Sequence, residues 1–250
     1  MKKKWLFLVG LALGVGVLMG GLVLATGEEA VAILRRVEEK QATDTSVTRM
    51  GMFIYPDAGA EDCRSYEVVG YAKGDQDEYI SFLEPRSIKG LTLLAKGDDQ
   101  WIYFPSTGRV RKIASKAKDQ SIQGVGGDFS YEDISAGKWE EKYDFIIAEA
   151  TDRYWVLAGT PKKESAYAKV NLVIDKEKLI LVKVEYYKEN EGHFKDLIME
   201  EIKTLDGREI ATRMRMMNYA KNSKTVIVIY DAKYNVEIDD KYFNPTRFYR

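Results

Sequence analysis

The stretch "LTLLAKGDDQWIYF", residues 91–104, consists of two short apolar runs joined by four turn-forming residues. Leu91–Ala95 and Gln100–Phe104 each have the length of a β-strand, and Lys96–Asp99 supplies the glycine and aspartates that favour a tight reversal. The stretch therefore predicts an antiparallel β-hairpin.

The same pattern recurs along most of the chain. Residues 166–187 and 195–219 each contain two β-rich runs separated by a short acidic turn. Such short connections place consecutive strands side by side in antiparallel order. We expect about eleven strands in one mainly antiparallel domain, and a sheet of that size should curl, close or fold over itself.

Two helices are expected to cover the apolar face of this sheet. Residues 27–41 predict an amphipathic helix, begun by a capping box between Thr26 and Glu29. Its apolar stripe recurs at helical spacing and consists of Ala30, Ile33, Leu34 and Val37. Residues 130–135 predict a second, short helix.

The N-terminus has the features of a secretory signal peptide. Three lysines precede an uncharged apolar run from Trp5 to Ala25, and Val23 and Ala25 are small residues suited to cleavage. We expect residues 1–25 to be the signal peptide and residues 26–250 to be one domain; an uncleaved inner-membrane anchor is the alternative. Without the three lysines, 35 basic residues face 39 acidic ones, a net charge of −4 that does not favour nucleic acid.

The glycine-rich stretch "GVGGDFSYEDIS", residues 124–135, raises the question of a phosphate loop. A dinucleotide fingerprint needs a preceding strand and a following long helix. Here residues 115–122 are polar, residues 129–134 are too short, and the Lys-Ser/Thr ending of a P-loop is absent. The stretch is better explained as a structural turn.

The carboxylates of Asp128, Glu132 and Asp133 could form an acid/base pair or a Ca²⁺ site. Their spacing does not match an EF-hand, and capping of the short helix by Asp128 or Ser130 explains them more simply. An envelope hydrolase that uses Asp128 or Asp133 remains a further hypothesis.

Catalytic and metal-binding side chains are scarce. His193 is the only histidine and is expected in a solvated turn, while Cys63 is the only cysteine and is expected to be buried. One cysteine excludes an intramolecular disulfide. A haem, a zinc site or a Ser-His-Asp triad would have too few of its usual side chains. We therefore expect no enzyme activity, no metal and no cofactor.

Several strands carry bulky apolar groups on both faces. Trp101 and Tyr103 share one face of their strand, while Ile102 and Phe104 share the other. A sheet with one wet face should instead alternate between apolar and polar residues. Each face therefore needs ordinary core packing over it, or an apolar ligand.

Residues 81–135 resemble the LolA-like family of outer-membrane lipoprotein-sorting proteins. The matching elements are Phe-Leu-x-Pro at 82–85, Ile-Lys-Gly at 88–90, Trp-Ile-Tyr-x-Pro at 101–105, Arg-Val-Arg-x-Ile at 109–113 and Gly-Asp-Phe-Ser-Tyr-Glu-Asp at 127–133. The signal peptide, the opening helix and "AYAKVNLVIDKEKLILVKVEYY" at 166–187 are also similar. Family members often have Gly-Ser-Asp where this chain has Gly126-Gly127-Asp128.

The resemblance implies a strongly curved, incomplete β-barrel with helices on its concave side. It implies a monomeric periplasmic carrier that binds acyl chains of lipoproteins or lipids, receives them from an inner-membrane transporter and passes them to an outer-membrane acceptor. The alternative is a lipid-sensing or exporter-associated module of the same fold. Expected acyl-chain contacts are Ile33, Leu34, Val37, Phe82, Leu91, Leu93, Trp101, Tyr103, Phe129, Tyr131 and Ile134. Arg109 and Arg111 could meet headgroups or a partner, or could simply be solvated.

Overall fold

A single large antiparallel sheet dominates the molecule. The computed structural model describes the backbone of residues 18–250 and the side chains of residues 27–250. Thirteen strands form the sheet: β1 (Thr45–Tyr55), β2 (Arg64–Lys73), β3 (Asp77–Glu84), β4 (Thr92–Lys96), β5 (Asp99–Phe104), β6 (Arg109–Lys112), β9 (Tyr143–Ala150), β10 (Tyr154–Pro161), β11 (Lys169–Asp175), β12 (Ile180–Lys188), β13 (Gly192–Leu205), β14 (Arg208–Asn218) and β15 (Ser223–Tyr234).

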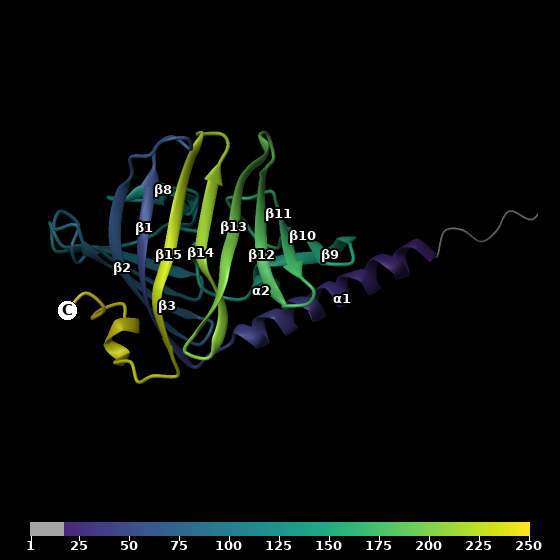
Figure 1. Ribbon diagram of the computed structural model, residues 1–250, viewed down its shortest axis with the longest axis horizontal. Coiled ribbons are helices and arrows are strands. Elements are labelled where there is room, and N and C mark those ends of the chain that lie inside the picture. The colour runs from purple at the N-terminus through teal and green to yellow at the C-terminus, as the bar shows by residue number, and fades with distance from the viewer. Residues whose placement is uncertain (1–17) are drawn as a thin grey trace, which may run out of the picture.

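Two antiparallel meanders make up this sheet. Strands β1 to β6 run in sequence towards one edge, and β9 to β15 run in sequence from the other. The meanders join where β1 pairs with β15, from Ser46 opposite Tyr234 to Tyr55 opposite Lys224. Strands β6 and β9 are the two edges, so the curved sheet stays open, as Figure 1 shows. The mainly antiparallel, incomplete barrel is confirmed, and its thirteen strands are two more than the expected eleven.

The connection between β6 and β9 fills the inside of the curve. These residues, 113–142, are called the plug here; they include η1 (Ser115–Ala117), the ribbon of β7 (Ser121–Ile122) and β8 (Gly126–Ser130), and α2 (Trp139–Lys142). Strand β8 contacts β1, β14 and β15 of the large sheet. In Figure 1 the ribbon lies behind these strands.

The short helix predicted over residues 130–135 is wrong, because residues 131–134 form only one turn. Ser130 Oγ accepts the N–H of Asp133 at 3.3 Å, while the Asp133 carboxylate accepts the N–H of Ser130 at 2.7 Å. This is the reciprocal arrangement of a capping box. Gly137 follows with φ +96°, which ends helical geometry until α2 begins.

Helix α1 spans Leu18–Gln41, nine residues longer at its start than the predicted helix over 27–41. The helical backbone passes through Thr26, so the predicted helix start at Thr26 is wrong. The predicted apolar stripe is correct, since Ala30, Ile33, Leu34 and Val37 are all buried. Helix α1 packs mainly on β9 and also contacts α2.

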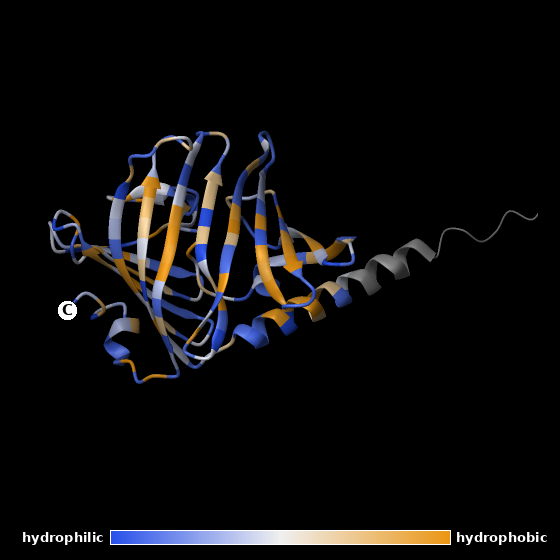
Figure 2. Cartoon of the chain, in the orientation of Figure 1, coloured by the Kyte–Doolittle hydropathy of each residue, from blue (hydrophilic) through white to orange (hydrophobic). Residues whose placement is uncertain are grey.

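Apolar residues cover both faces of the β3–β5 region. The inner face, with Phe82, Leu93 and Ile102, belongs to the main core beneath the plug. The outer face carries a second cluster in which Leu94, Trp101 and Tyr103 pack against the C-terminal segment beyond β15, which includes η2 (Asp240–Phe243). Core packing therefore explains the two-faced apolar pattern of β5. Figure 2 shows the bands of hydrophobic and hydrophilic residues along the strands and α1.

Candidate functional site

An apolar cavity of about 320 Å³ lies between α1 and the strands β11 to β15; we call it the α1 cavity. Most of its lining is aliphatic, and two polar side chains, Glu38 and Gln41, complete it with Trp139. The lining residues are Leu34, Val37, Glu38, Gln41, Trp139, Leu172, Ile174, Ile180, Leu181, Met199, Ile210, Ala211, Met214 and Ile229. An apolar cavity of this size with few polar groups is the usual form of a small-molecule site.

The far wall of the α1 cavity is incompletely covered by the protein itself. Leu172 and Ile174 on β11 are fully buried, but Met199, Met214 and Ile229 remain partly exposed. Met199 and Met214 are direct cross-strand neighbours on β13 and β14. Their unbranched thioether side chains adapt to different apolar shapes. Filling the cavity with hydrocarbon would remove this surface from water, at about 0.8 kcal/mol per buried CH₂.

Glu38 is the acidic residue of the cavity lining. Its Oε1 accepts the backbone N–H of Trp139 at 3.1 Å, which links α1 to α2. Its Oε2 is buried and has no partner among the residues that the structure describes. Burial raises the pKa of the Glu38 carboxyl, opposed by the Trp139 N–H and assisted by the nearby Glu140 carboxylate.

The plug is bound to the sheet through the glycine-rich stretch. The Asp128 carboxylate accepts the hydroxyls of Ser223 at 2.6 Å and Thr225 at 2.8 Å, both on β15. Gly127 has φ +83°, and a Cβ there would lie 3.0 Å from Ile54 Cδ1 and from Thr225 Oγ1. The glycine therefore lets the ribbon approach the sheet closely. Asp128 thus bonds to the sheet and does not cap a helix.

A buried ion pair fixes the turn that follows the ribbon. Asp133 Oδ2 lies 2.6 Å from Lys195 Nζ on β13, and both side chains are at most 3% exposed. Tyr167 donates its hydroxyl to Asp133 Oδ1 at 2.6 Å and also accepts from Lys195 at 2.6 Å. Burial and the Asp133 charge raise the pKa of Tyr167, which stays a protonated donor. A carboxylate so fully bonded has a structural role.

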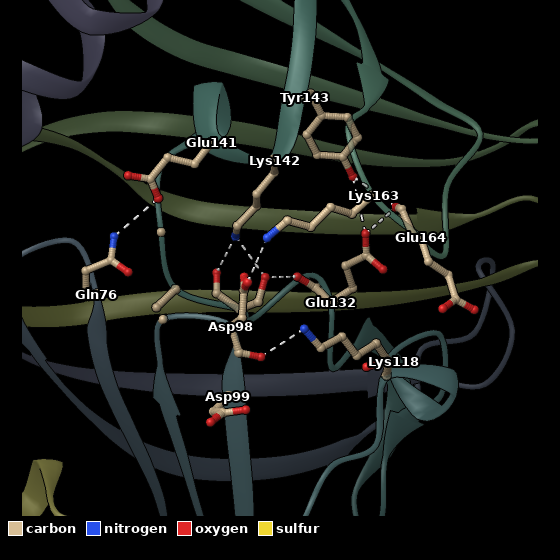
Figure 3. A pocket seen from close by; sticks show the side chains of 16 residues that line it. Gln76, Asp98, Asp99, Lys118, Glu132, Glu141, Lys142, Tyr143, Lys163 and Glu164 are labelled. Atoms are coloured by element: carbon tan, nitrogen blue, oxygen red, sulfur yellow. Dashed lines mark hydrogen bonds and ion pairs between the residues drawn. The ribbon is translucent and has the colours of Figure 1, made fainter.

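A second, polar cavity of about 450 Å³ lies on the other side of the plug, between the β4–β5 turn and residues 163–165 (Figure 3). Its charges largely pair with each other: Lys163 contacts Asp98 at 3.2 Å, and Lys118 donates to the Asp98 carbonyl at 3.0 Å. Lys142 donates to both oxygens of Ser135, and burial lowers its pKa. Glu132 accepts the Ala166 N–H at 2.7 Å and the Tyr143 hydroxyl at 3.3 Å. The network ties the plug to the sheet and resembles neither an acid/base pair nor an apolar site.

The comparisons with known proteins agree with this architecture. A family model with the description "uncharacterized protein" matches residues 74–250. A DUF1329 family protein from Desulfovibrio piger is 26% identical with a TM-score of 0.76, covering 88% of this chain and 97% of that one. An outer membrane lipoprotein-sorting protein domain from Vibrio parahaemolyticus is 25% identical with a TM-score of 0.79, covering 90% and 100%. The chain belongs to the LolA-like family.

The fold of a LolA superfamily protein from Nitrosomonas europaea is also shared, at 23% identity and a TM-score of 0.71 over 86% of this chain and 97% of that one. No curated relative matches the sequence. In this LolA-like chain, residues 27–250 hold no cluster of potential metal ligands. Within the helices that the structure describes, none is long and apolar enough to span a bilayer.

The LolA-like fold brings only some of the predicted contact residues to the α1 cavity. Leu34 and Val37 line it, and Ile33 is buried in the adjoining core. Phe82, Leu91 and Leu93 are buried in the same core, together with Phe129 and Tyr131 of the plug. Ile134, also in the plug, lines a smaller pocket beside β3–β5. Trp101 and Tyr103 lie in the outer cluster, on the face away from the cavity. Arg109 and Arg111 are exposed on the edge strand β6, where Arg111 donates to Gln123 at 2.8 Å.

Most of the cavity wall was missed from the sequence. Met199, Ile210, Met214 and Ile229 lie on the consecutive strands β13 to β15, but they form a cavity only with α1, which is more than 150 residues away in the sequence. The available signal was the repeated Met in two consecutive β-runs, which is soft and unbranched where Ile or Val would be usual.

Two single residues also differ from expectation. Cys63 is exposed in the loop between β1 and β2, so its predicted burial is wrong; its polar neighbours in "AEDCRS" keep that loop in solvent. His193 is exposed as expected but is the second residue of β13, not part of the turn, and its Nε2 lies 2.6 Å from Asp196 Oδ1.

Proposed function

We propose that the protein is a periplasmic carrier that holds an acyl chain of a lipoprotein or lipid in the α1 cavity. The observation that carries the proposal is the aliphatic lining between α1 and β11–β15, which includes partly exposed Met199, Met214 and Ile229. The likeness to a lipoprotein-sorting domain supports it. Residues 1–25 then act as the signal peptide and residues 26–250 as the carrier domain.

Release of the chain follows from the position of α1 in this proposal. The plug is held by buried polar contacts such as Asp133 with Lys195. The polar contacts between α1 and β14 lie instead at the exposed end of the helix, where Arg208 donates to the Lys40 carbonyl at 2.8 Å and Lys40 contacts Glu209 at 3.4 Å. Movement of α1 therefore breaks exposed polar contacts, whereas movement of the plug breaks buried ones, which cost more to break. An inner-membrane transporter and an outer-membrane acceptor act as donor and recipient, and Arg109 and Arg111 on the edge strand offer a basic contact for headgroups or either partner. The carrier acts as a monomer without catalysis.

Trp139 makes a direct test possible because it lines the cavity. Purified, delipidated protein is titrated with dodecanol brominated at its sixth carbon, and bromine quenching of tryptophan fluorescence is measured. We expect saturable quenching that largely disappears in Trp139→Phe. The control is Trp101→Phe, which removes a tryptophan from the outer cluster and should leave the quenching. Absence of saturable quenching at micromolar protein would overturn the proposal.

A further inference from the structure

The entrance of the α1 cavity has a chemistry of its own. Glu38, Gln41 and Trp139 line both the cavity and a polar cleft of about 680 Å³ next to it. A chain inserted in the cavity would therefore place its head in the cleft, beside Glu38. The charged residues of this cleft are Arg35, Glu38, Glu39, Asp75, Glu78, Lys138 and Glu140.

The cleft has an excess of negative charge close to the cavity. Both of its cations are already paired, Arg35 with Glu140 at 2.9 Å and Lys138 with Asp75 at 3.5 Å. The carboxylates of Glu38 and Glu39 exceed these two pairs, whereas Glu78 lies near the Lys142 ammonium, which partly offsets its charge. A headgroup that enters here meets uncompensated acidic groups.

Glu38 is also the acceptor that lacks a donor. One of its carboxylate oxygens bonds to the Trp139 N–H, while the buried Oε2 has no partner in the described part of the chain. An unsatisfied buried acceptor is costly, and a donor brought by a ligand would remove that cost. Burial raises the pKa of this carboxyl, as expected of a group kept from water.

We infer that the α1 cavity selects straight-chain lipids whose head donates a hydrogen bond and carries no negative charge, and that Glu38 Oε2 is the acceptor. Hydroxyl, amide and ammonium heads meet this requirement. A free fatty acid does not, because its carboxylate would lie beside Glu38. Like charges at close range repel strongly where water is largely excluded, so a carboxylate head should be disfavoured. The inference rests on the proposed function.

The experiment compares four dodecyl ligands, each brominated at the sixth carbon, by quenching of tryptophan fluorescence at pH 8. Their heads are hydroxyl, primary amide, ammonium and carboxylate. With the full chain we expect the carboxylate to bind at least about tenfold more weakly than the hydroxyl and amide ligands. In Glu38→Gln the dissociation constants of the carboxylate and hydroxyl ligands should differ by no more than about twofold, because the protein's negative charge is gone and the glutamine amide of the variant can donate to a carboxylate.

The matched control is Glu28→Gln, which removes the same charge from an exposed position on α1 that lines neither the cavity nor the cleft. This control variant should keep the wild-type preference for the hydroxyl and amide heads over the carboxylate head. Equal binding of all four heads, or tightest binding of the carboxylate, would overturn the inference while leaving an acyl-chain carrier intact. Equal effects of the two substitutions would show that overall charge, and not Glu38, sets the preference. If no ligand binds, the proposed function falls as well.

Discussion

Removing the charge of Asp133 should destabilise the protein strongly. The substitution Asp133→Asn keeps the size of the side chain but leaves the Lys195 ammonium buried without a counter-charge, since these side chains are 1% and 3% exposed. Breaking one partner of a buried ion pair costs about 3–5 kcal/mol. In a domain of this size, each kcal/mol of lost stability lowers Tm by roughly 2–4 °C, so Tm should fall by about 6–20 °C.

Urea unfolding followed by circular dichroism measures this cost. The matched control is Asp144→Asn, which breaks an ion pair with Lys162 whose side chains are 77% and 39% exposed and should cost at most about 1 kcal/mol. Adding Lys195→Met to Asp133→Asn should restore much of the loss, because the unpaired charge is then gone. A loss for Asp133→Asn no larger than that of the control would refute the burial of this ion pair.

Three further substitutions test other parts of the structure. Met214→Glu places a charge in the wall of the α1 cavity and should weaken alkyl-chain binding at least about tenfold, whereas the volume-conserving Met214→Leu should retain binding. Equal quenching curves for the two variants would contradict this. Gly127→Ala should lower the free energy of unfolding in urea more than Gly192→Ala does. Both substitutions cost about 1–2 kcal/mol of backbone strain, because both glycines have positive φ, but Gly192 has open space around it, whereas a Cβ at Gly127 also makes close contacts at 3.0 Å. The folded-state pKa of Glu38 lies above its ordinary value of 4.5, so this group binds more protons in the folded state and its contribution to stability falls as pH rises above 4.5. Stability of Glu38→Gln relative to wild type should therefore increase between pH 4.5 and pH 8, and a decrease would contradict the assigned burial.

Local sequence patterns were sufficient to predict the strands and their antiparallel order, whereas the curved, open form of the sheet was implied by the family resemblance. The hairpin over residues 91–104 is β4 and β5, because its turn and its apolar runs are decided by neighbours in the chain. The apolar stripe of α1 was readable for the same reason, while its start was not, since the helix continues N-terminally through Thr26. Capping signals are weak where helical structure continues on both sides.

The site was harder to predict because it depends on distant pairings. Trp101 and Tyr103 alternate correctly with Ile102, but periodicity alone does not say which face points inward. The C-terminal segment decides this by covering the outer face with Phe243, Phe248 and their neighbours. In the same way, the acids of "GVGGDFSYEDIS" have partners on β13 and β15, up to about a hundred residues away, so local spacing favoured a helix cap.

Photo-crosslinking of an alkyl chain to the protein tests the central claim most directly. The probe is a dodecyl amide with a diazirine at its terminal carbon, and the labelled peptides are identified by mass spectrometry. We expect labels on the walls of the α1 cavity, in residues 34–41, 172–181 or 199–214. Labels confined to the outer cluster around Trp101 and Tyr103, or labelling that excess dodecanol does not displace, would contradict an acyl-chain site beneath α1.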